Sequence, residues 1–142
     1  MKKVKTAVVG ASGYTGQELL RILLRHPGVE LVCVTSRQYA GKPLSEVFPR
    51  FKHVPGAELK FTDSDVAAIA ATGAEAAFLA LPHGVSASYG RGLVDAGIRV
   101  IDLSADFRLN DPVVYEDFYG KPHPDPELMQ EAPYGMPEWH RE

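Results

Sequence analysis

The sequence has a single cysteine among its 142 residues. One thiol, Cys33, excludes an internal disulfide and a metal cluster built on cysteines. The five histidines form no i, i+4 pair and no H-E-x-x-H pattern, so the sequence predicts no metal site. Cys33 lies between Val32 and Val34, where a thiol packs as a small hydrophobic group, and we do not expect it to be a nucleophile. These features favour a cytoplasmic protein.

Long apolar runs are also missing. The apolar run before Gly10 has three residues, which is too short for a signal-peptide core, and no later stretch approaches the roughly 20 residues of a membrane span. We therefore expect no membrane partner. A chain of this length buries roughly 70% of the surface that it exposes when unfolded, which favours one domain over residues 1–142.

Basic charge is not gathered into runs. Residues 1–60 carry ten Lys or Arg and four Glu, whereas the other 82 residues carry five basic and fourteen acidic side chains. The basic half suits a phosphate-bearing ligand, although an ordinary solvated surface explains it equally well. A nucleic-acid-binding domain needs a continuous basic face with aromatic residues, and we expect no nucleic-acid partner here.

The first 36 residues have the pattern of a strand, a glycine-rich turn, a helix and a second strand. Residues 4–9 are short and β-branched, residues 14–26 carry leucines at helical spacing before Pro27-Gly28, and residues 29–36 form another apolar run. This pattern is typical of a βαβ unit with parallel strands and a right-handed crossover.

The next residues continue the alternation of strands and helices. A long connection, residues 37–57, contains three prolines and two glycines and is predicted to lie on the surface. After it, strands are expected at residues 58–62, 74–81 and 98–103, and helices at residues 66–71 and 85–96. The alternation predicts an α/β fold with a doubly wound, mostly parallel sheet of the Rossmann type.

Proline marks the C-terminal part of the chain. Six of the eleven prolines lie in the last 31 residues, where a central strand does not tolerate them. We therefore predict a Pro-rich C-terminal extension with short helices at residues 113–118 and 126–130. One further strand is predicted at residues 132–135.

Residues 10–16, Gly-Ala-Ser-Gly-Tyr-Thr-Gly, connect the first predicted strand to the first predicted helix. Glycines at such a turn let the backbone approach a pyrophosphate, which binds free N–H groups at the start of the helix. The spacing is G-x-x-G-x-x-G instead of G-x-G-x-x-G, with one more residue between the first two glycines, and this changes which N–H groups face the phosphates. A glycine turn without a ligand is the alternative. The predicted cofactor contacts are Gly10, Ser12, Gly13, Tyr14, Thr15 and Gly16.

The end of the second predicted strand bears on the choice of cofactor. A site for NAD places an acidic residue there, which accepts hydrogen bonds from the ribose 2′-hydroxyl. This chain has Ser36 and Arg37 instead. A guanidinium pairs with the 2′-phosphate of NADP and a serine hydroxyl adds a hydrogen bond, so NADP(H) is the predicted cofactor. The alternative is that Arg37 is a solvated loop residue.

Leu81, Pro82 and His83 follow the strand at the predicted topological switch point. Sheets of this kind bind ligands there, at the carboxyl ends of their strands. These residues are therefore predicted to line the nicotinamide side of the cofactor. A plain turn with a surface histidine is equally compatible with the sequence.

Arg108 follows the last predicted strand of the sheet, in the segment at residues 101–108. Its guanidinium is a candidate for binding an anionic group of a substrate. The alternative is a cluster of caps and turns in which Arg108 pairs with Asp106 or Asp111.

Five segments, taken in order, are far more specific than the glycine turn alone. They are residues 10–16, residues 35–37 followed by 41–44, residues 80–84, residues 102–109 (Asp-Leu-Ser-Ala-Asp-Phe-Arg-Leu) and residues 134–138 (Tyr-Gly-Met-Pro-Glu). Together they resemble the N-acetyl-gamma-glutamyl-phosphate reductases of arginine biosynthesis along essentially the whole chain. The reductase that acts on an aminoadipyl phosphate in lysine biosynthesis is the nearest alternative, and aspartate-semialdehyde dehydrogenase is a more distant relative.

The resemblance implies an NADPH-dependent reductive dephosphorylation of an acyl phosphate. In this family a Cys thiolate displaces phosphate to form a thioester, hydride from NADPH reduces it to a semialdehyde, and a His serves as acid and base. By motif match, the pyrophosphate is held by Gly13 to Gly16, the 2′-phosphate by Ser36 and Arg37, and the nicotinamide side by residues 81–83. Arg108 matches a phosphate-contacting arginine of the wider superfamily.

The resemblance also implies what these residues lack. The family's catalytic Cys, in an Asn-Pro-Gly-Cys-Tyr-Pro context, comes shortly after the Tyr-Gly-Met-Pro-Glu motif, so we expect the Cys, the His and the substrate domain to lie beyond residue 142. Residues 1–142 are then the NAD(P)-binding domain, without a catalytic residue, of a homo-oligomeric enzyme that acts on a small acyl phosphate. The alternative is a stand-alone NADP(H)-binding module that senses redox state.

Overall fold

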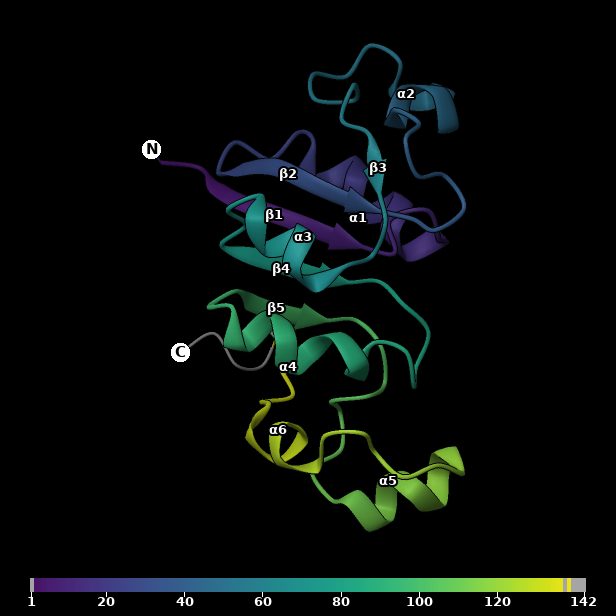
Figure 1. Ribbon diagram of the computed structural model, residues 1–142, viewed down its shortest axis with the longest axis vertical. Coiled ribbons are helices and arrows are strands. Elements are labelled where there is room, and N and C mark those ends of the chain that lie inside the picture. Colours follow the sequence, from purple (N-terminus) through teal and green to yellow (C-terminus); the bar gives the residue numbers. More distant parts are fainter. Residues whose placement is uncertain (1, 137, 139–142) are drawn as a thin grey trace.

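The computed structural model describes residues 2–136 and 138, which contain one sheet of five strands (Figure 1). The strands are β1 (Val4–Val9), β2 (Val29–Thr35), β3 (Phe61–Thr62), β4 (Ala76–Leu79) and β5 (Arg99–Asp102). Every pair of neighbouring strands is parallel, in the order β3-β2-β1-β4-β5. The prediction of a doubly wound α/β fold is confirmed, and the strand order changes direction between β1 and β4.

Helices connect the strands and form the C-terminal extension. They are α1 (Tyr14–Leu23), α2 (Leu44–Val47), the 3₁₀ helix η1 (Pro49–Phe51), α3 (Val66–Ala71), α4 (Ala87–Asp95), α5 (Pro112–Tyr119) and α6 (Pro126–Glu131). The helices predicted in the extension correspond to α5 and α6. Both begin with an aspartate that caps the helix and a proline in the first turn, as expected for helix N-termini.

The sheet is covered on both faces. Val9 of β1 packs with Ile69 of α3 and Leu93 of α4, whereas Val8 packs with Leu20 of α1 in a separate core. Successive residues of a strand point to opposite faces, so one apolar run serves both cores. In Figure 1, α3 and α4 accordingly lie on the near face of the sheet and α1 lies behind it.

Residues 37–57 lie largely at the surface, as the sequence predicted, but they are not a plain loop. They contain α2 and η1, and the side chains of Leu44, Phe51 and Ala57 are at most 3% exposed. These side chains pack with Phe61 of β3, and the ring of Phe48 meets both Phe51 and Phe61 at nearly right angles. The prolines and glycines obscured an apolar set that covers the β3 edge of the sheet.

The strand predicted at residues 132–135 is wrong. The chain leaves α6 at Ala132, and residues 132–135 have no ladder partner within the described parts of the chain. Pro133 has no N–H to donate, and residues 133–136 are exposed, so neither backbone pairing nor burial favours a strand there.

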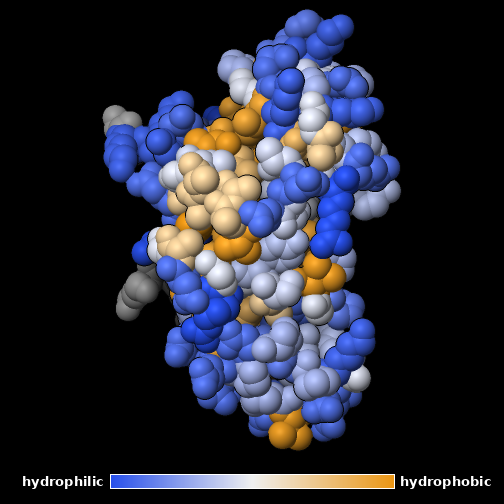
Figure 2. Space-filling view, in the orientation of Figure 1, coloured by the Kyte–Doolittle hydropathy of each residue, from blue (hydrophilic) through white to orange (hydrophobic). Residues whose placement is uncertain are grey.

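Hydrophilic residues cover most of the face shown in Figure 2, and apolar residues gather near α3. Among residues 2–136 and 138, no helix has the length and apolar character needed to cross a bilayer. The polar groups that concern ligand binding lie at the ends of β1, β2, β4 and β5, where the parallel strands direct their carboxyl ends to the same edge of the sheet.

Candidate functional site

The glycine turn between β1 and α1 lies very close to the segment that follows β4. Gly10 has φ +78°, and a Cβ atom there would lie 2.6 Å from the carbonyl oxygen of Ala80. A Cβ on Gly16 would lie 2.6 Å from the Cα atom of Ala11. Because both neighbours are backbone atoms, no side-chain rotation relieves the overlap, and both positions require glycine.

Gly13 differs from these two glycines because it faces open space. It caps α1 with an ordinary φ of −73°, and the nearest atom to an added Cβ is 3.9 Å away. The N–H groups of Tyr14, Thr15 and Gly16 have no acceptor among the described residues, and the first turn of α1 has no acidic side chain. The positive end of α1 is therefore open to an anion.

The end of β2 is joined to the glycine turn by hydrogen bonds. Thr35 accepts the N–H of Gly10 on its hydroxyl (3.1 Å) and the N–H of Ala11 on its carbonyl (2.9 Å). The Ser36 hydroxyl donates to the Ser12 hydroxyl at 2.9 Å. Ser12, by accepting this bond, keeps its own proton to donate to a ligand, so the predicted contacts at positions 12 and 36 form one unit.

Arg37 follows this unit and is exposed to solvent. It forms no ion pair with any residue that the structure describes. An unpaired guanidinium beside Ser36 suits a phosphate. The role of Arg37 stays a prediction, and its exposure is compatible with both a phosphate contact and a solvated loop.

The turn after β4 lies beside the glycine turn. The side chain of Leu81 reaches within 2.6 Å of the position of a Cβ on Gly10. Pro82 and His83 are exposed, and the His83 ring packs against Tyr119 of α5 at 5.4 Å between centroids. The structure thus brings residues 10–16, 36 and 81 together and adds a contact from α5, which sequence reasoning missed.

Arg108 is placed apart from the glycine turn. Its Nε atom donates to the carbonyl of Ser104 (3.0 Å) and an Nη atom donates to the carbonyl of Leu103 (3.4 Å). It forms no ion pair with Asp106 or Asp111, contrary to the alternative interpretation, since Asp111 instead caps α5.

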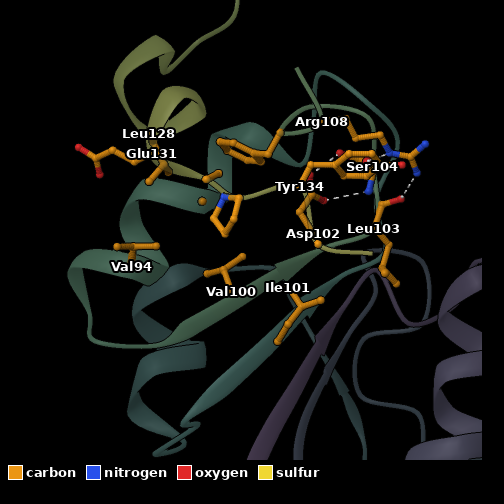
Figure 3. A pocket seen from close by; sticks show the side chains of 15 residues that line it. Val94, Val100, Ile101, Asp102, Leu103, Ser104, Arg108, Leu128, Glu131 and Tyr134 are labelled. Carbon is orange, nitrogen blue, oxygen red and sulfur yellow. Dashed lines mark hydrogen bonds between the residues drawn. The ribbon is translucent and has the colours of Figure 1, made fainter. Parts of the chain in front are cut away.

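Arg108 borders a cavity of about 640 Å³ at the free side of β5, which Figure 3 shows from close by. The lining comes from β5, α4, α6 and the residues after them, and it is mainly apolar. Since β4 lies between β5 and β1, this cavity does not include the glycine turn. The cavity and the dinucleotide contacts predicted from the sequence are therefore different places on the sheet.

Cys33 is buried in β2, as its apolar neighbours predicted. Its side chain is 3% exposed, and its Sγ atom lies 3.8 Å from the hydroxyl of Thr62. Burial raises the pKa of the Cys33 thiol above its usual value. A thiol held neutral and away from solvent is a poor nucleophile.

The strand order, the glycine turn at the switch point and the open start of α1 define a dinucleotide-binding α/β domain. Residues 5–142 match the family described as semialdehyde dehydrogenase, NAD binding domain. The chain belongs to this family.

Two curated relatives show the range of sequences that resemble the chain. N-acetyl-gamma-glutamyl-phosphate reductase of Akkermansia muciniphila is 79% identical over 142 residues, which are 100% of this chain and 41% of the relative. The [LysW]-L-2-aminoadipate/[LysW]-L-glutamate phosphate reductase of Saccharolobus solfataricus is 51% identical over 140 residues, which are 99% of this chain and 39% of the relative. The chain thus spans about two fifths of the length of these relatives.

Among solved structures, aspartate semialdehyde dehydrogenase with NADP from Candida albicans superposes with a TM-score of 0.65 and 21% identity. The match covers 77% of this chain and 32% of that one. A Rex-family repressor superposes with a TM-score of 0.57 and 18% identity, over 73% of this chain and 46% of that one. Likeness at this level of identity establishes the fold.

Proposed function

We propose that the chain binds NADP(H), with the pyrophosphate at the start of α1, the 2′-phosphate beside Arg37 and the nicotinamide ring beside residues 81–83. The observation that carries this proposal is the combination of three unpaired N–H groups at Tyr14 to Gly16 with an unpaired guanidinium at Arg37. No carboxylate of the first turn of α1 opposes an anion.

The described residues fit such a cofactor on structural grounds. Gly13 leaves space for the pyrophosphate where any larger side chain would stand, and the Ser12 hydroxyl has a free proton for a phosphate oxygen. When bound, NADPH supplies a hydride to an acceptor. The chain's own residues bind the phosphates and orient the nicotinamide end at the turn after β4. Arg37 makes the site selective for NADP over NAD by pairing with the 2′-phosphate.

We further propose that the chain is the cofactor-binding part of an N-acetyl-gamma-glutamyl-phosphate reductase, which reduces N-acetylglutamyl 5-phosphate to the 5-semialdehyde. The name and 79% identity of the Akkermansia relative support this substrate over the aminoadipyl or LysW-linked substrates of relatives near 50% identity. The chain by itself is expected to reduce no acyl phosphate, because its only cysteine is buried in β2.

Cofactor binding is tested by titrating the protein with NADPH and with NADH and following nucleotide fluorescence. NADPH is expected to bind more tightly by about 10-fold or more, since a charge-assisted contact is worth about 1.5–3 kcal/mol. Arg37→Ala is expected to remove the difference, whereas Arg25→Ala, an exposed arginine beyond the far end of α1, keeps it. Equal affinity of the unmodified protein for the two nucleotides would refute the assignment.

A further inference from the structure

Asp106 is a buried carboxylate that binds the turn after β4. Its side chain has no exposed surface. One oxygen accepts the N–H of Gly84 at 2.7 Å, and the other accepts the N–H of Ala87 at 2.8 Å. These two donors lie on either side of the start of α4, so one side chain sets the path of residues 82–86.

Tyr115 of α5 provides the third donor to this carboxylate. Its hydroxyl, which is buried, donates to Asp106 at 3.0 Å. Burial, followed by the hydrogen bond to Asp106, raises the pKa of Tyr115 to about 12, so the phenol remains a donor at neutral pH. The Tyr115 ring also packs against Tyr119 at 4.8 Å between centroids, and Tyr119 packs against His83 at 5.4 Å.

A second carboxylate supports the same turn from β5. Asp102 accepts the hydroxyl of Ser86 at 2.6 Å and the hydroxyl of Ser104 at 2.7 Å. Ser104 in turn accepts the N–H of Asp106 at 3.0 Å. The turn that bears His83 is therefore fixed by the segment at residues 102–106 and by α5.

We infer that Asp106, together with Tyr115, is a positioning residue for the nicotinamide half of the cofactor, because it fixes the turn at residues 82–86 and, through the Tyr119 ring, the place of His83. This inference rests on the proposed binding of NADP(H). Three donors converge on Asp106, and only a carboxylate accepts all of them, since an asparagine would present an NH₂ group to one.

The test compares NADPH with 2′,5′-ADP, which carries the adenine half of the cofactor and lacks the nicotinamide. Tyr115→Phe removes one donor and keeps the ring, so its affinity for NADPH is expected to fall about 3- to 10-fold while its affinity for 2′,5′-ADP stays unchanged. Asp106→Asn is expected to lower the affinity for NADPH relative to that for 2′,5′-ADP by a larger factor.

The matched control is Tyr89→Phe. This buried tyrosine of α4 also loses one hydrogen bond, from its hydroxyl to the carbonyl of Ser64 at 3.2 Å, and keeps its backbone bond to Ser86 of the turn. Its ratio of NADPH to 2′,5′-ADP affinity is expected to match that of the unmodified protein. In addition, the imidazole NMR signals of His83 are expected to shift in Tyr115→Phe and to stay in place in Tyr89→Phe.

The possible outcomes separate the inference from the proposal beneath it. If the unmodified protein binds neither nucleotide, the proposed function fails. If it binds both, but Tyr115→Phe lowers the two affinities equally or leaves both unchanged, the positioning role of Asp106 and Tyr115 is overturned. Should Asp106→Asn fail to fold, Tyr115→Phe and the His83 signals still decide between these results.

Discussion

Two helices, α1 and α4, begin beside the carboxyl ends of the neighbouring strands β1 and β4, and the chain treats their N-termini in opposite ways. At α4 each backbone N–H from Gly84 to Tyr89 has a partner, and Asp106 supplies two of the acceptors. At α1 the N–H groups of Tyr14 to Gly16 have none within the described residues. Both ends attract anions, but one is already occupied by the protein's own carboxylate.

The contrast shows how similar local structures acquire different roles. At the start of α4, Asp106 accepts the N–H groups of Gly84 and Ala87, so the turn that bears His83 is held in place. The start of α1 is left without a capping side chain at a small cost in stability, because a glycine N-cap is worse than an aspartate by only a few tenths of a kcal/mol. An unsatisfied helix end persists where a ligand completes it.

The largest effect on this contrast is expected from Gly10→Ala. The added Cβ would stand 2.6 Å from the Ala80 carbonyl at a φ of +78°, so overlap and backbone strain act together. The free energy of unfolding is expected to fall by about 3 kcal/mol or more. Urea denaturation followed by circular dichroism measures it, with Gly41→Ala as a control that shares the positive φ but meets no atom within 4 Å. Equal losses in the two variants would show that close approach to β4 is unimportant.

A second substitution places a carboxylate at the start of α1, where α4 already has that of Asp106. Gly13→Asp places a carboxylate at the N-cap, where the extended backbone (φ −73°, ψ 171°) suits a capping side chain. The free energy of unfolding is expected to stay level or to rise by a few tenths of a kcal/mol, because aspartate caps slightly better than glycine. NADPH affinity is expected to fall by about 100-fold, since the carboxylate occupies the N–H groups and repels the phosphates. A stable variant that still bound NADPH normally would place the phosphates elsewhere.

The smallest effect concerns α6, a third helix whose N-terminus is bound by an acidic side chain. Asp125 caps α6 and binds Arg91 of α4 through two hydrogen bonds, and this contact lowers the pKa of the Asp125 carboxyl. Because the pKa is lower in the folded protein, the contact with Arg91 stabilises the fold at any pH above the pKa of the unfolded carboxyl. This stabilisation is lost as the pH falls through the folded pKa. Asp125→Asn keeps the cap but is expected to lose about 0.5–1 kcal/mol at pH 7, a difference that shrinks as the pH falls through the lowered pKa of Asp125.

Urea denaturation at pH 7 and at pH 3 measures this loss. Asp111→Asn is the matched control, because Asp111 caps α5 without an ion pair to any described residue. A pH-independent difference between Asp125→Asn and the unmodified protein would contradict the contribution of Arg91.

Much of the fold could be predicted from the sequence, because its main signals are local. The apolar runs predicted β1 and β2, the leucine spacing predicted α1, and the short helices predicted at residues 113–118 and 126–130 correspond to α5 and α6. The helix predicted at residues 14–26 ends instead at Leu23, since Arg25 and His26 bond three residues back in a tighter turn.

The site was predictable only in part. The glycine turn, Ser36 and Arg37 carry their chemistry in their types and order, and the structure places Ser12 and Ser36 in contact. The sequence could not show that Asp106 faces the start of α4, because this depends on how the residues after β5 fold against that helix. The apolar set within residues 37–57 was missed for the same reason: its burial against Phe61 is a tertiary effect.

The difference between the two helix ends is tested by an NMR titration with 2′,5′-ADP. Amide signals of Tyr14, Thr15 and Gly16 are expected to move strongly and to saturate, whereas those of Gly84 and Ala87 stay in place because Asp106 already binds them. Shifts at α4 with none at α1 would contradict the assignment of the phosphate site.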